Sequence, residues 1–111
     1  MKVFSGQRAF LVQRLSALAM LAFLAAAALR LALGETVSIA QWQAWTARPL
    51  GATLVLLLSG ATLLHAWVGI RDVALDYVKP LALRMTLLAV AVFGLLLLGG
   101  WTTLIVLSHA L

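Results

Sequence analysis

The chain has 111 residues, of which 65% are hydrophobic and only 10% are charged, and it contains no cysteine. A soluble domain carries about 25% charged residues, and so short a chain can enclose only a small core. Composition therefore excludes a free soluble enzyme, a disordered tail and any thiolate site, and it predicts a membrane protein. The net charge of +5 does not indicate nucleic-acid binding, because the basic residues lie scattered at the edges of apolar stretches.

Three apolar stretches are long enough to cross a bilayer, which takes about 20 mostly apolar residues in a helix. They run from about Leu15 to Leu33, from about Leu50 to Ile70, and from about Met85 to Leu107. The first contains one charge, Arg30, near its far end, where the side chain can snorkel to the headgroups. We expect an all-α membrane protein with three transmembrane helices in a single domain over residues 1–111.

The connections contain residues that end and begin helices. Gly34 can end the first helix, Pro49 suits the first turn of the second, and Pro80 can open the third. Trp42 and Trp45 lie in the connection between the first two spans, where tryptophan is typical of the membrane interface. We interpret both as interfacial anchors.

The distribution of Lys and Arg predicts the orientation. Six of the eight lie at the N-terminus or in the second connection, and two lie on the opposite side. Cytoplasmic loops carry the excess of positive charge, so we expect a cytoplasmic N-terminus and a periplasmic C-terminus. The six are Lys2, Arg8, Arg14, Arg71, Lys79 and Arg84, and the two are Arg30 and Arg48.

His65 is the most unusual polar residue at membrane depth, about five residues before the end of the second span. Imidazole commonly fills an axial position on haem iron, and the small residues Ala61 and Gly69 share its helix face. The alternative is an imidazole hydrogen-bonded to a neighbouring helix. His109 is expected near the opposite face of the membrane, so a second histidine ligand would come from another chain.

Three further residues are candidates for a cofactor site near the cytoplasmic side. Arg14 at the start of the first span could pair with a haem propionate, or simply snorkel as a topology residue. Asp76 and Tyr77 suit a quinone head group, because a phenol can donate to a carbonyl and a carboxylate can orient it. The alternative is a turn-capping Asp beside an interfacial Tyr.

Two sequence segments carry a family resemblance. His65-Ala66-Trp67-Val68-Gly69, followed by Asp76-Tyr77-Val78-Lys79-Pro80-Leu81-Ala82-Leu83-Arg84, resembles the hydrophobic membrane anchor subunit of bacterial succinate dehydrogenase, the smaller D-type anchor. Span number, length and orientation agree along nearly the whole chain. The first span is the weakest part, where only Leu11-Val12-Gln13-Arg14-Leu15-Ser16 is similar to the family.

The resemblance implies a subunit that is not catalytic alone, in a multi-pass arrangement in the bacterial inner membrane. It implies pairing with a second three-helix anchor, the cytochrome b subunit, to hold one haem b, with His65 as the axial iron ligand from this chain. Tyr77 and Asp76 would then contribute to the ubiquinone site, and Arg14 would lie near the haem propionates. The two anchors would seat a flavoprotein and an iron–sulfur subunit on the cytoplasmic face.

Three alternatives remain open at this point. A fumarate reductase anchor shares class and topology and differs in the direction of electron flow. A small multidrug exporter of similar length resembles a four-span protein with a carboxylate in its first span, which this chain lacks. An assembly protein without a cofactor is the third, and a haem spectrum would separate it from an anchor.

Overall fold

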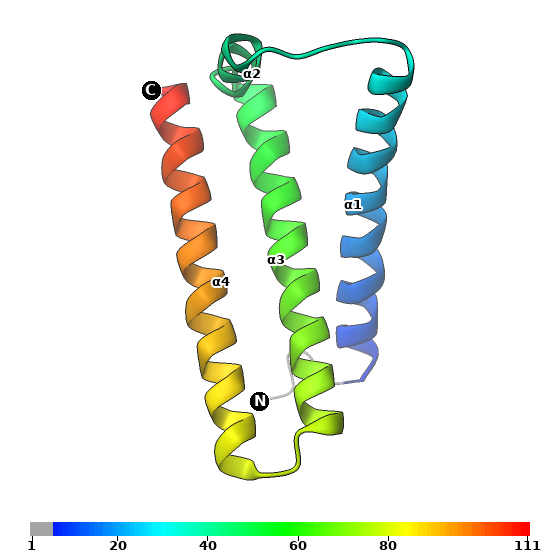
Figure 1. Cartoon of the computed structure of the whole chain (residues 1–111), viewed down its shortest axis with the longest axis vertical. Helices are drawn as coiled ribbons and strands as arrows, with labels where there is room; N and C mark the ends of the chain where they lie inside the picture. Colours follow the sequence, from blue (N-terminus) through cyan, green and yellow to red (C-terminus); the bar gives the residue numbers. More distant parts are fainter. Residues whose placement is uncertain (1–5) are drawn as a thin grey trace.

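The computed structural model describes residues 6–111, which form four helices and no strand. Three of them are long and apolar enough to cross a membrane, so the expected fold class, an all-α membrane protein with three spanning helices, is confirmed. They stand side by side with α3 in the middle, packed on α1 and on α4, and α2 lies across one end (Figure 1). The helices are α1 (Gln7–Ala32), α2 (Ile39–Thr46), α3 (Pro49–Tyr77) and α4 (Leu81–Ala110).

The bundle has two distinct ends. The hairpin end is where α1 begins and where α3 joins α4, and the α2 end is the opposite one (Figure 1). The helices extend further toward the hairpin end than the apolar stretches do. α1 begins about two turns before Leu15, α3 continues past Ile70, and α4 begins before Met85. The polar residues at the hairpin end therefore lie mostly on helices.

The helix ends follow the local sequence as expected. Gly34 adopts a left-handed conformation with φ 81°, and its N–H donates to the Leu31 carbonyl at 3.0 Å. The N–H of Glu35 donates to the Arg30 carbonyl, also at 3.0 Å, which completes a Schellman motif at the end of α1. Pro49 occupies the first turn of α3, where its missing N–H leaves no intrahelical hydrogen bond unmade.

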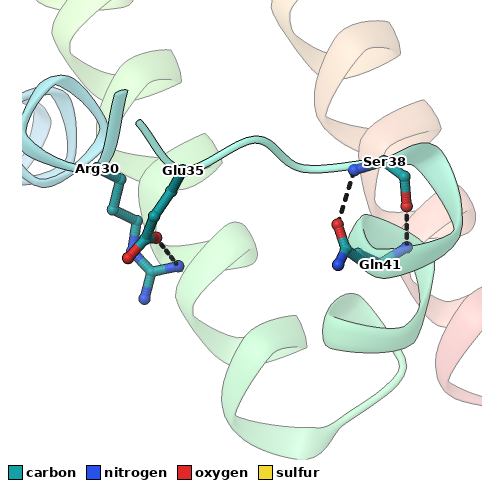
Figure 2. Close-up of polar contacts among 4 residues, drawn as sticks. All are labelled: Arg30, Glu35, Ser38 and Gln41. Atoms are coloured by element: carbon teal, nitrogen blue, oxygen red, sulfur yellow. Dashed lines mark hydrogen bonds and ion pairs between the residues drawn. The ribbon is translucent and has the colours of Figure 1, made fainter. Parts of the chain in front are cut away.

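The helix α2 was not expected in the first connection. Ser38 forms a capping box with Gln41, in which each backbone N–H donates to the other side chain at 2.9 and 3.1 Å (Figure 2). The Trp42 and Trp45 rings lie 5.5 Å apart on this helix. The spacing Ser-x-x-Gln was the sequence signal for this helix start, and it was overlooked.

The described residues enclose very little apolar volume. Five hydrophobic side chains are buried, and all are Ala or Val, with Val68 of α3 the most completely enclosed. Most large apolar side chains of the three long helices point outward instead. A surface this apolar requires acyl chains or partner helices around it, because its exposure to water is energetically unfavourable.

Candidate functional site

His65 lies on α3 and reaches across to α1. Its Nδ1 is 3.2 Å from the Oγ of Ser16, which joins two residues 49 positions apart in the chain. Ser16 is only 5% exposed and its hydroxyl also donates to the backbone carbonyl of Gln13 at 3.1 Å. His65 itself is half-buried, twelve residues before the end of α3, or about 18 Å from the hairpin end.

The other ring nitrogen of His65 is available. Within residues 6–111 no hydrogen bond engages its Nε2. A neutral imidazole offers a lone pair on one nitrogen when the other is protonated, and that lone pair is the usual metal-binding atom. Ser16 of α1 thus holds the ring through Nδ1, and Nε2 makes no hydrogen bond within the described residues.

Gln13 of α1 adds a second polar group beside His65. Its amide nitrogen lies on the Gly69 side, where an added Cβ on that glycine would meet it at 3.7 Å, an ordinary contact distance. Its Oε1 is buried and accepts no hydrogen bond from the described residues. Gln13 and Ser16 were not singled out for this role from the sequence, because nothing local identifies which face of α1 meets α3.

Asp76 and Tyr77 are the last two residues of α3, at the hairpin end. Tyr77 is 78% exposed and Asp76 is also exposed. Because α3 is continuous, His65, Gly69 and Asp76 share one helix face, with Asp76 about 16 Å along the axis from His65. The structure therefore aligns Asp76 with His65 without contact, and it places Tyr77 about 120° around the helix from His65.

An apolar groove lies along the last part of α3, beside α4. It runs between α3 and α4 from Gly69 to Val78, with Leu87 and Ala91 on the opposite wall, and has a volume of about 440 Å³. Its walls are almost entirely hydrocarbon. The groove suits an apolar chain whose polar head lies at the Tyr77 end.

Arg14 is not brought against His65. Arg14 precedes Ser16 by two positions, which is about 200° around α1, and it therefore lies on the other side of that helix. Its guanidinium carbon lies 5.1 Å from the centre of the Phe10 ring, and the side chain is exposed. Arg14 is therefore available to a partner on the outer face of α1.

A second imidazole contact lies at the α2 end. Nδ1 of His109, in the last turn of α4, is 3.3 Å from Oγ1 of the fully buried Thr46 in α2. The two histidines lie toward opposite ends of the bundle, as expected from the sequence. No group of three or more His, Cys, Asp or Glu side chains that could hold a metal ion occurs in residues 6–111.

Residues 5–100 match the protein family described as the succinate dehydrogenase/fumarate reductase transmembrane subunit. The match covers α1, α2 and α3 and most of α4, and so includes every candidate residue discussed above except His109.

Proposed function

The chain belongs to the succinate dehydrogenase/fumarate reductase transmembrane subunit family, and we propose that it is the D-type anchor of a bacterial succinate dehydrogenase. In this role it binds haem b together with a cytochrome b subunit and contributes to the ubiquinone site. The observation that carries the proposal is the arrangement on α3, where His65 lies at membrane depth, Asp76 shares its helix face and Tyr77 is the next and last residue of the helix.

The positive charges support an orientation with the hairpin end in the cytoplasm. Of the six Lys and Arg on that side, five lie in the described part of the chain, and Lys2 lies outside it. Arg30 and Arg48 lie at the α2 end, on either side of α2. The excess at the hairpin end is the distribution expected of a cytoplasmic face in the inner membrane, with a periplasmic C-terminus.

His65 fits the axial position of a haem. Its Nδ1 is engaged by Ser16 and its Nε2 is open, which is the donor arrangement that an axial imidazole needs. Bound haem would supply one-electron redox chemistry. This chain offers one such imidazole at that depth, because His109 lies at the other end, so the second axial ligand belongs to the cytochrome b subunit in this proposal.

Asp76 and Tyr77 fit a quinone head group at the hairpin end. The exposed phenol of Tyr77 can donate a hydrogen bond to a quinone carbonyl, and the adjacent Asp76 carboxylate can orient the phenol or relay a proton. The apolar groove between α3 and α4 offers a place for the hydrocarbon tail. Their exposure here leaves them accessible to partner subunits, which would exclude water from the pocket.

Arg14 is the proposed propionate partner. A guanidinium forms bidentate pairs with carboxylates, and this one is exposed on the outer face of α1. In this proposal Arg14 would hold a haem propionate at the interface with the cytochrome b subunit. The flavoprotein and the iron–sulfur subunit would dock at the hairpin end and deliver electrons from succinate, so this chain alone catalyses nothing.

Extraction of the whole complex in mild detergent tests the proposal. We expect a flavoprotein, an iron–sulfur protein and a second hydrophobic subunit to co-purify with this chain, together with a haem b spectrum on reduction. Faster succinate oxidation by quinone than fumarate reduction by quinol would favour the dehydrogenase over the fumarate reductase anchor, which the family also includes. A chain that purifies without haem or these partners would contradict the proposal.

A further inference from the structure

The Ser16 hydroxyl occupies a buried position between a backbone carbonyl and an imidazole. It lies 3.1 Å from the carbonyl oxygen of Gln13 and 3.2 Å from Nδ1 of His65. A serine hydroxyl carries one hydrogen, and a carbonyl oxygen can only accept. If Ser16 donates to Gln13, then His65 must donate to Ser16 for both contacts to be hydrogen bonds.

This assignment fixes the tautomer of His65. The proton resides on Nδ1, and the lone pair is left on Nε2, the nitrogen that no described residue engages. Ligand histidines in metal sites almost always donate their other N–H to an oxygen, which sets the ring orientation and increases the basicity of the ligating nitrogen. Ser16 supplies an oxygen of this kind from another helix.

We infer that Ser16 is a positioning residue that holds His65 in the Nδ1–H tautomer and thereby sets the ligand strength of its Nε2 toward haem iron. The inference rests on the proposed function, because it assumes that His65 is the axial ligand. A donated hydrogen bond gives the ring more anionic character, which favours the ferric state. Removing the acceptor therefore raises the haem midpoint potential.

A purely structural role for the same contact makes a different prediction. Interhelical hydrogen bonds of serine also hold membrane helices together, and serine often bonds to its own helix. A helix-holding bond would affect assembly and thermal stability and leave the haem potential and spectrum of the assembled complex unchanged. The midpoint potential therefore separates the two roles.

The test compares variants of the whole assembled complex. Ser16→Ala removes the acceptor, and Ser16→Thr keeps the hydroxyl. Ser108→Ala is the matched control, because the exposed Ser108 makes the same kind of bond, to the carbonyl three residues earlier at 2.7 Å, and its hydroxyl bonds to no imidazole among the described residues. The measurements are the redox titration of the haem, its electron paramagnetic resonance spectrum and its haem content.

We expect Ser16→Ala to raise the midpoint potential, shift the low-spin ferric signal and lower haem affinity by roughly tenfold or more. Ser16→Thr and Ser108→Ala should match the wild type. If Ser16→Ala prevents assembly, Ser16→Cys takes its place, since a thiol is of similar size and a weaker acceptor. An unchanged potential and spectrum in the assembled Ala or Cys variant would overturn the inference.

A parallel His65→Leu variant distinguishes an error in the role of Ser16 from an error in the assignment of His65 as the iron ligand. If His65→Leu changes the haem spectrum and Ser16→Ala does not, the positioning role is wrong and the ligand assignment stands. If His65→Leu leaves a normal bis-imidazole spectrum, the ligand assignment is wrong and the inference about Ser16 is overturned with it.

Discussion

Two regions of the bundle contain nearly the same hydrogen-bonded unit. In the interior of the half nearer the hairpin end, Ser16 contacts Nδ1 of His65 at 3.2 Å, and at the α2 end Thr46 contacts Nδ1 of His109 at 3.3 Å. Each hydroxyl also donates to the carbonyl of a glutamine three residues earlier, at 3.1 Å in both cases. The local chemistry is therefore almost identical.

The surroundings of the two units differ. His65 is part of a spanning helix and lies at membrane depth, where a polar ring needs a compensating partner. His109 lies in the last turn of α4 and fastens the short helix α2, at an end where the Trp pair indicates the membrane interface. Depth in the membrane and neighbouring residues, and not the hydrogen bond itself, therefore distinguish a candidate iron ligand from a contact that only holds two helices together.

Replacing the two histidines separately gives the largest expected difference between the ends. His65→Leu should remove or strongly alter the haem spectrum of the purified complex, because the axial imidazole is lost. His109→Leu should leave haem content and spectrum unchanged. Equal haem loss in both variants would show that the spectrum reports general destabilisation and would break the distinction.

A change at Tyr77, at the hairpin end, should affect the rate of quinone reduction and leave the haem spectrum unchanged. Tyr77→Phe removes a phenol hydroxyl and should slow quinone reduction by roughly tenfold or more, because a donor to the quinone carbonyl is lost. Steady-state quinone reduction measures this, with the haem spectrum recorded on the same sample. Trp101→Phe, another exposed aromatic substitution, is the control, and an equal loss of rate there would contradict the assignment.

A change at the α2 end should affect stability alone. Gly51→Ala places a Cβ against the backbone carbonyl of Trp45, which is too close for any side chain. We expect destabilisation by about 1–3 kcal/mol, since backbone must move to make room. Thermal unfolding in detergent measures it, and Gly60→Ala is the control because its Cβ would meet nothing within 4 Å. Equal melting temperatures for Gly51→Ala and Gly60→Ala would argue against the close packing of Gly51 on Trp45.

The smallest expected effect comes from the hydroxyl at the α2 end. Thr46→Val keeps the side-chain shape and removes the contact to His109, so we expect a loss of about 1 kcal/mol or less and no change in haem potential. Redox titration of the haem in Thr46→Val and in Ser16→Ala, side by side, measures how differently the two hydroxyls affect the haem potential. A shift of the haem potential in Thr46→Val would mean that the potential responds to distant packing.

Helix ends and the main candidate residues could be predicted from the sequence. Gly34 and Pro49 act through backbone conformation within a few residues, so their effects are encoded locally. The Ser38 capping box is equally local and could have revealed α2. His65 stood out because a polar ring in an apolar stretch is costly wherever it points.

The sequence by itself determined three spanning helices, their orientation signal and the residues worth testing, because hydropathy, charge placement and capping act over short distances. Only the tertiary structure decided that Ser16 faces His65, that Thr46 faces His109 and that Arg14 turns away from the imidazole. Those contacts depend on the rotation and axial offset of each helix against its neighbour. Packing of the whole bundle sets these two quantities, and no local pattern encodes them.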